Sequence, residues 1–214
     1  QLDLIGGCAG LIGSLLMRSS EQALSLAIQA GEQLLATQNE QGCWEQPRST
    51  KPGLLGFSHG TAGHAAALAQ LHRATGESRF LKAARAALLY ERGHYNSSEA
   101  NWPDFRESGQ DLNYMVSWCH GAPGIGLARA CLWGTALWDD TCKKEIAIAT
   151  ATTTNKATMG LVTDHLCCGS LGLMLTLEAL TMGPWRLDAS VVDDARLAAN
   201  RIRSDALKRS TGKD

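Results

Sequence analysis

Hydrophobic residues recur at helical spacing along most of the chain. In residues 20–37, 78–91 and 188–208, apolar side chains fall on one side of a helix and polar side chains on the other. Four shorter runs are more uniformly apolar: residues 11–16, 65–73, 125–132 and 173–180. A helix that is apolar all round is typically buried, whereas an amphipathic helix covers a core with one face. The sequence therefore predicts an all-α protein in which inner helices alternate with amphipathic outer helices.

The ends of some of these helices are marked by individual residues. Ser78 is expected to be the N-cap of the helix that follows it. The pair Gly183-Pro184 is expected to end the fourth apolar helix. The third outer helix is harder to place, because residues 141–151 have a helical pattern but the β-branched residues at 150–154 predict fraying.

A short glycine motif precedes or opens each apolar run. Its four copies are Gly7-Cys8-Ala9-Gly10, Gly60-Thr61-Ala62-Gly63, Gly121-Ala122-Pro123-Gly124 and Gly169-Ser170-Leu171-Gly172. The copies are about 50 residues apart, a period that suits one helical hairpin with its connections. We expect hairpins whose inner helices form a ring, with the Gly-x-x-Gly turns gathered at one end.

Composition narrows the classes of protein and of partner. The chain is 44% hydrophobic, and its 20 Lys and Arg residues against 21 Asp and Glu residues leave a net charge of −1. This balance gives no reason to expect a nucleic-acid partner. No apolar run approaches the roughly 20 residues that span a bilayer, so we expect no integral membrane segment. Seven cysteines, an odd number, favour a reducing compartment and hence the cytoplasm.

Three cysteines stand at the same place in the repeat, just before a glycine turn. They are Cys119, Cys167 and Cys168. A free cysteine is usually a buried packing residue, but packing does not require this common register. Helix N-termini stabilise thiolates, and catalytic zinc sites take three protein ligands and keep one open position. We therefore predict a Zn²⁺ site built from these three sulfurs.

Three segments carry a resemblance to a known family. They read Gly-Phe-Ser-His-Gly-Thr-Ala-Gly (56–63), Ser-Trp-Cys-His-Gly-Ala-Pro-Gly-Ile-Gly (117–126) and Leu-Cys-Cys-Gly-Ser-Leu-Gly (166–172). Together they resemble the lanthionine synthetase C-like cyclases, and the Cys-Cys-Gly form resembles the cyclase domain of class II lanthipeptide synthetases. The resemblance implies an α/α toroid that adds peptide cysteine thiols to dehydroalanine or dehydrobutyrine, giving lanthionine or methyllanthionine thioether rings.

The resemblance also assigns roles to individual residues. By position in its motifs, the metal ligands are Cys119, Cys167 and Cys168, and the catalytic candidates are His59, His120 and Asp3. One of the two histidines is expected to protonate the enolate that forms when the thiol adds. Each of these three residues could instead serve the backbone or the packing, and His165 is expected to be a partner beside the metal rather than a ligand.

Two positions depart from the family pattern. Most cyclases have Cys-His-Gly where this chain has Cys-Cys-Gly, with Cys168 in place of the histidine. Some members carry an active-site arginine where this chain has Met115, so that role is either dispensable here or supplied from elsewhere, with Arg106 as the candidate.

The resemblance further implies that residues 1–214 are a partial cyclase domain, without flanking hairpins and without the dehydratase domain of a class II synthetase. Its partners would be a dehydrated precursor peptide and that dehydratase in the same polypeptide. One alternative is a non-catalytic, zinc-containing module that binds thiol compounds or partner proteins. Another is a zinc prenyltransferase subunit, which the three cysteines and the 6% aromatic content disfavour.

Overall fold

Helices make up the regular structure of the chain. The computed structural model describes residues 1–45, 51–106, 112–161 and 163–211, and these residues form eight helices and no named strand. The helices are α1 (Cys8–Leu16), α2 (Glu21–Thr37), α3 (Thr61–Thr75), α4 (Ser78–Arg92), α5 (Ala122–Cys131), α6 (Asp140–Thr158), α7 (Ser170–Met182) and α8 (Ala189–Thr211). The prediction of an all-α protein is confirmed.

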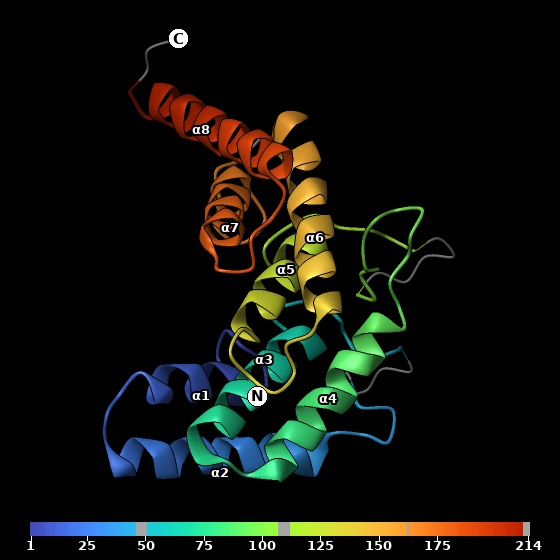
Figure 1. The fold of residues 1–214 in the computed structure, drawn as a ribbon, viewed down its shortest axis with the longest axis vertical. Helices are drawn as coiled ribbons and strands as arrows, with labels where there is room; N and C mark the ends of the chain where they lie inside the picture. The colour runs from blue at the N-terminus through green and yellow to red at the C-terminus, as the bar shows by residue number, and fades with distance from the viewer. Residues whose placement is uncertain (46–50, 107–111, 162, 212–214) are drawn as a thin grey trace.

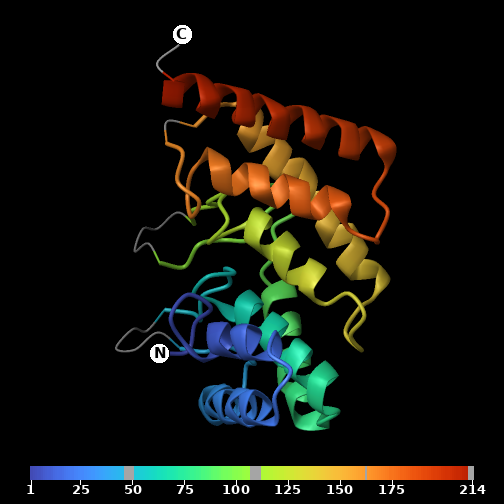
Figure 2. The same ribbon diagram turned by 90° about the vertical axis from the view of Figure 1, so that its left-hand side faces the viewer.

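The helices pack as four successive hairpins, α1–α2, α3–α4, α5–α6 and α7–α8. The inner helices α1, α3, α5 and α7 contact one another in that order. Figures 1 and 2 show the hairpins following one another from α1 and α2 at one end of the molecule to α7 and α8 at the other. Among the described residues α1 and α7 make no contact, so the four hairpins form an open arc and not a closed ring.

The second glycine of each motif explains why the motif recurs. It is the third residue of its helix, and a Cβ there would overlap the carbonyl oxygen six residues earlier. The pairs are Gly10 and Leu4, Gly63 and Phe57, Gly124 and Trp118, and Gly172 and Leu166. Only glycine therefore lets the incoming chain cross so closely over the first turn of the inner helix. The residues between each glycine and its paired carbonyl, which include the turn before the helix, are thereby held at one end of the arc.

Two local predictions are wrong. Helix α6 does not fray at residues 150–154 but continues to Thr158. Thr150, Thr153 and Thr154 are buried, and each hydroxyl donates to the carbonyl four residues earlier, at 2.6–2.9 Å. Burial with a satisfied hydroxyl outweighs the weak helix propensity of threonine. Likewise, Ser78 is the first helical residue of α4 rather than its cap, and Glu77 holds the cap position.

A buried ion network joins α4, α5 and α6. Arg129 of α5 is fully buried, donates through Nε to Glu145 of α6 at 2.7 Å, and also pairs with the buried Glu91 of α4. Arg92 of α4 adds contacts to Glu145 at 3.0 Å and to Asp139, the N-cap of α6, at 2.9 Å. Because the α4 and α6 backbones do not contact each other in the described residues, these side chains link the second hairpin to the third.

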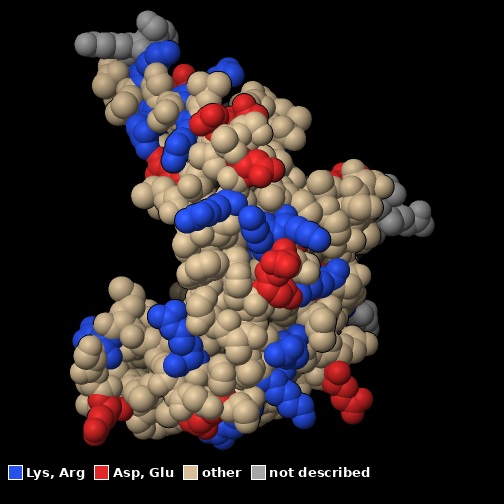
Figure 3. Space-filling model, viewed as in Figure 1, with Lys and Arg blue, Asp and Glu red and all other residues tan. Residues whose placement is uncertain are grey.

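The outer surface carries charges of both signs. Figure 3 shows Lys and Arg side chains interspersed with Asp and Glu on one face, and a hollow between the ends formed by α1–α2 and α7–α8. In the part of the chain that the structure describes, no helix is both long and apolar enough to traverse a bilayer.

Candidate metal centre

Backbone hydrogen bonds join the first three glycine turns to one another. The amide of Leu4 donates to the carbonyl of Ser58 at 2.9 Å, and the amide of Phe57 donates to the carbonyl of Cys119 at 3.0 Å. The amide of Ser58 also reaches the Cys119 carbonyl, at 3.3 Å. Side chains from turns about 50 residues apart in sequence are thereby brought to one end of the arc.

Three sulfurs meet beside these turns. The Sγ atoms of Cys119, Cys167 and Cys168 all lie within 4.8 Å of one another, and those of Cys119 and Cys168 are 3.7 Å apart. Among the described residues, no other group of three His, Cys, Asp or Glu side chains has this metal-binding geometry. Cys119 is buried and the other two are exposed, so the cluster is reached from one side.

The three thiols fit zinc on chemical grounds. Burial and the neighbouring Cys119 and Cys168 raise the pKa of the Cys167 thiol to about 12. The pKa of Cys168 is also raised, first by burial. Three thiolates this close repel one another and are therefore held together by a cation or stay protonated. With Zn–S bonds of about 2.3 Å, a tetrahedral site would separate two sulfurs by about 3.8 Å, which agrees with the separation of Cys119 and Cys168.

The segment before α5 fixes Cys119. The hydroxyl of Ser117 lies 3.1 Å from the Cys119 Sγ, and the amide of Ser117 donates to the His120 carbonyl at 3.0 Å. Gly121 has φ of +83°, and a Cβ there would overlap the carbonyl oxygen of Met115. Because L-residues rarely adopt this φ, glycine is required for the turn that aims Cys119 at its partners.

Asp3 and His59 form a pair next to the cluster. His59 Nδ1 lies 2.8 Å from Asp3 Oδ2, and the His59 side chain is 43% exposed. Burial raises the pKa of Asp3, but hydrogen bonds from the Gly6 amide and the His59 ring more than offset it and lower the pKa to about 2. An ionised Asp3 keeps the proton of a neutral His59 on Nδ1 and leaves Nε2 as the basic atom.

His120 is buried between this pair and a second carboxylate. Its ring centroid lies 6.4 Å from that of His59, and its Nδ1 is 3.6 Å from Asp104 Oδ1. Nε2 is buried and has no hydrogen-bond partner among the described residues. Burial lowers the pKa of His120 to about 4, although Asp104 opposes the shift.

Asp104 was missed by sequence reasoning, and it pairs with Arg106, the residue that the sequence offers as one of two explanations for the missing arginine. Arg106 Nε lies 3.0 Å from both Asp104 carboxylate oxygens, and one terminal nitrogen of Arg106 is 3.1 Å from the Met115 Sδ. The only signal in the sequence was an acidic and a basic residue two apart in a long connection. Its path is set by distant contacts, including the amide of Asp104 donating to the Asn113 carbonyl at 2.7 Å.

Two features of the turn that carries Cys167 and Cys168 complete the description of this centre. His165 is exposed and is not part of the sulfur group, and its expected role as a partner beside the metal stays a prediction. The turn that carries Cys167 and Cys168 is anchored to α8 by Arg209, which donates to the Asp164 carboxylate at 2.7 and 3.0 Å.

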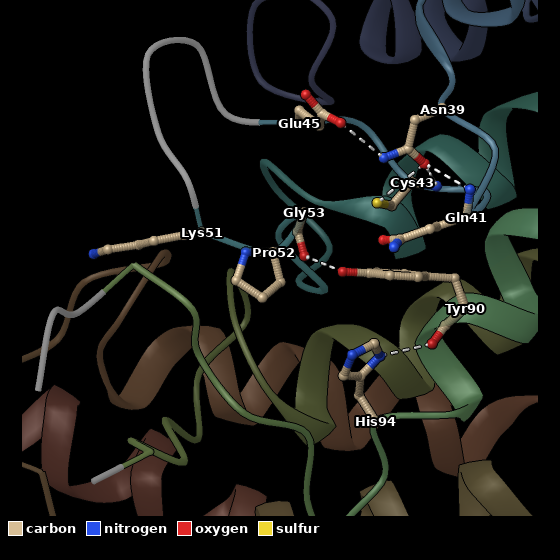
Figure 4. A pocket seen from close by; sticks show the side chains of 9 residues that line it. All are labelled: Asn39, Gln41, Cys43, Glu45, Lys51, Pro52, Gly53, Tyr90 and His94. Atoms are coloured by element: carbon tan, nitrogen blue, oxygen red, sulfur yellow. Dashed lines mark hydrogen bonds between the residues drawn. The ribbon is translucent and has the colours of Figure 1, made fainter. Parts of the chain in front are cut away.

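Two hollows adjoin the connections and the inner helices. One, of about 490 Å³, opens beside the cluster; its mainly apolar lining is Trp118, Leu127, Leu166, Cys167, Gly172, Leu175 and Thr176. The other, of about 780 Å³, lies between the two long connections and contains none of the three clustered cysteines. Figure 4 shows hydrogen bonds between several of its lining residues; for example, Tyr90 donates to the Gly53 carbonyl at 3.1 Å.

Comparison with known proteins decides the family. A sequence model of the lanthionine synthetase C-like proteins matches residues 1–182. The chain belongs to this family. The resemblance seen in the three glycine-turn segments is thus confirmed.

A solved structure shares the fold of this chain. The chain is similar to nisin cyclase, with a TM-score of 0.71 and 18% identity over 99% of this chain and 56% of that one. The α/α toroid is therefore confirmed, and the chain spans just over half the length of nisin cyclase. No curated protein matches the sequence.

Proposed function

We propose that this member of the lanthionine synthetase C-like family is a zinc-dependent lanthipeptide cyclase. It would add cysteine thiols of a dehydrated precursor peptide to dehydroalanine or dehydrobutyrine and so form thioether rings. The observation that carries the proposal is the meeting of three sulfurs beside a carboxylate–histidine pair at the same end of the arc. Neither group alone requires this reaction, but the addition of a thiol needs both a thiolate site and an acid.

In this proposal, Cys119, Cys167 and Cys168 hold the zinc ion. When bound, zinc lowers the pKa of a coordinated substrate thiol and presents it as a thiolate. The substrate sulfur forms a bond to the β-carbon of the dehydro residue, and the π electrons move onto the adjacent carbonyl oxygen. His59 takes up the proton that the thiol loses, and the ionised Asp3 stabilises the resulting imidazolium. His59 then delivers a proton to the α-carbon. Of the two histidines, His59 is the exposed one and has the closer carboxylate partner.

The surroundings of the cluster support a peptide as the substrate. The apolar hollow that includes Cys167 and Leu175 can hold a large side chain of a residue next to the reacting cysteine. The dehydro residue would be made by a dehydratase, and the Cys-Cys-Gly motif at residues 167–169 suggests the class II arrangement, with both domains in one cytoplasmic polypeptide.

Metal analysis and peptide mass spectrometry on the full-length polypeptide test the proposal. We expect about one zinc per chain. Cys119→Ala should lose both the metal and ring formation, and Cys131→Ala, which lies outside the sulfur group, should lose neither. His59→Ala should keep the zinc but lose most of the cyclisation rate. Unchanged cyclisation by His59→Ala would remove that residue from the acid role.

The second candidate function is the non-catalytic, thiol-binding module. The exposure of Cys167 and Cys168 favours it, because a small thiol could reach a bound metal without any acid nearby. Full-length protein that binds zinc and thiols but cyclises no dehydrated peptide would establish this function in place of the cyclase.

A further inference from the structure

Ser117 places a buried hydroxyl against the one buried sulfur of the cluster. Its Oγ lies 3.1 Å from the Cys119 Sγ, and the two residues are 1% and 2% exposed. The turn before α5 sets the place of this hydroxyl, because the Ser117 amide donates to the His120 carbonyl at 3.0 Å. The contact between oxygen and sulfur therefore belongs to the folded turn and is closed to water.

The hydrogen-bond partners of Ser117 decide where its proton goes. A serine hydroxyl has one proton to donate and can also accept. Ser117 Oγ accepts from the His120 amide at 3.3 Å, and it can donate either to the His120 carbonyl at 3.3 Å or to the Cys119 sulfur. That carbonyl already accepts from the Ser117 amide. A thiolate is a charged acceptor, and charge-assisted hydrogen bonds are about twice as strong as neutral ones. When Cys119 is a thiolate, the hydroxyl therefore donates to its sulfur.

The other two sulfurs of the cluster lack such a donor. Cys167 and Cys168 are exposed, and in the described part of the chain no N–H or O–H group donates to either sulfur. One ligand of the proposed metal site thus differs from the other two by a single buried hydroxyl. Hydrogen bonds to a ligating sulfur draw charge away from it and tune the metal, as in iron–sulfur and blue-copper centres.

We propose that Ser117 is a positioning residue of the metal centre, whose hydroxyl donates to the Cys119 thiolate and reduces the negative charge that this sulfur places on the metal. The inference rests on the proposed zinc site of the cyclase and adds a residue that acts only through Cys119. A centre of three thiolates is rich in negative charge, so its hold on a fourth sulfur is weak. By drawing charge from Cys119, Ser117 strengthens that hold. The hydroxyl keeps its proton throughout.

Cobalt absorption tests the charge on the sulfur without turnover. Co²⁺ can be bound by the same ligands as Zn²⁺, and its sulfur-to-cobalt band moves to longer wavelength when the sulfur holds more charge. In the cobalt-loaded full-length protein, Ser117→Ala should therefore shift this band to longer wavelength. It should also weaken the binding of 2-mercaptoethanol about threefold, a part of the net effect of one hydrogen bond. Ser117→Thr, which keeps a hydroxyl, should restore the band and the affinity.

Ser58 supplies a matched control. Its buried hydroxyl also bonds to Cys119, but to the backbone carbonyl, at 3.4 Å. Ser58→Ala should therefore leave the band and the thiol affinity at their wild-type values. Ser117→Ala should keep its full metal content, because the amide of Phe57 still holds the Cys119 carbonyl at 3.0 Å. If circular dichroism shows that Ser117→Ala does not fold, Ser117→Gly takes its place with the same expectations.

Kinetics give a second readout. In Ser117→Ala, KM for a dehydrated peptide should rise about threefold without a loss of kcat, whereas a misplaced sulfur would lower kcat. An unshifted band in Ser117→Ala would overturn the inference even if the wild type cyclises peptides. Loss of its metal would do the same, because the hydroxyl would then hold Cys119 in place rather than draw charge from it. Wild-type protein that shows the expected shifts but never cyclises would refute the cyclase function alone, and one that binds no cobalt would refute both.

Discussion

The Sγ atom of Cys119 lies 3.7 Å from that of Cys168, although 49 residues separate them in the sequence. The two belong to turns that precede neighbouring inner helices, α5 and α7, which pack against each other. Their proximity is therefore a consequence of the hairpin repeat and not of a local motif such as Cys-x-x-Cys. A metal ion held by the three sulfurs would therefore join the last two hairpins at this end of the arc.

In the proposed zinc site, the identity of the ligand at position 168 should separate metal retention from reactivity. Cys168→Ala is expected to lose most of its zinc, whereas Cys168→His should retain about one zinc per chain because imidazole is also a zinc ligand. Replacing a thiolate by a neutral ligand makes the centre less negative, so the substrate sulfur is held more tightly. We therefore expect slower cyclisation by Cys168→His at an unchanged zinc content, measured by metal analysis and single-turnover kinetics. Faster cyclisation would contradict this account of the charge.

The apolar hollow beside Cys167 should set a preference for apolar residues next to the reacting cysteine. Leu175, 48% exposed, lies in its lining. Leu175→Asp should raise KM for a peptide with a leucine beside that cysteine by about tenfold, since one large side chain contributes about 1.5–3 kcal/mol when buried. Steady-state kinetics with leucine and serine peptides measure the effect. Leu197→Asp on α8, where the leucine is 72% exposed, is the matched control. An equal change for both peptides would exclude the hollow as a subsite.

His64 should make the fold sensitive to mild acid. It is buried in α3 and stacked on Trp44 at 4.4 Å, and burial lowers its pKa to about 4. Because the folded pKa lies below the unfolded value of 6.5, the stabilisation is complete above pH 6.5 and is lost as the pH falls toward 4. The loss should be about 2–3 kcal/mol, at 1.36 kcal/mol per unit.

Comparing the pH dependence of stability between the wild type and His64→Leu isolates the contribution of His64. The free energy of unfolding in urea, measured at pH 7.5 and 4.5, should fall by about 2–3 kcal/mol less for His64→Leu than for the wild type. Parallel curves for the wild type and His64→Leu would show that His64 is not the titrating group.

Much of the fold was readable because the repeat imposes the same requirement four times. Gly63 and Gly124 lie against backbone carbonyls that leave no room for a Cβ. Each turn therefore requires glycine at this position, and the recurring glycines in the sequence mark the turns. The convergence of the three sulfurs was readable for the same reason, since the residues just before each glycine turn lie at one end of the arc. Helix α6 was misjudged at Thr153 because burial, which decides the matter there, is a tertiary property.

The residues around the three cysteines were harder to predict from the sequence than the cysteines themselves. Asp104 lies in an irregular connection, where no periodicity reports the path of the chain. Its place beside His120 depends on Asn101, which donates to the carbonyl of Met115 at 3.1 Å and accepts from the Ala122 amide at 2.6 Å. Such contacts between a loop and a helix N-terminus join residues of no particular spacing, so they are found only in the folded structure.

The buried network around Arg129 should be the most sensitive polar feature of the fold. Burial raises the pKa of Glu91 to about 7, although the charge of Arg129 opposes the shift, so removing Arg129 leaves a buried carboxylate without its compensating cation. Removal of one partner of a buried ion pair costs about 3–5 kcal/mol. Arg129→Met should therefore lower the free energy of unfolding in urea by that amount. In the Arg129→Met background, Glu91→Gln should recover part of the loss because it removes the unpaired charge.

By contrast, Arg203→Met, which breaks an exposed pair with Glu178, should cost less than about 1 kcal/mol. If Arg129→Met and Arg203→Met were equally stable, the network would not be what joins α4 to α6.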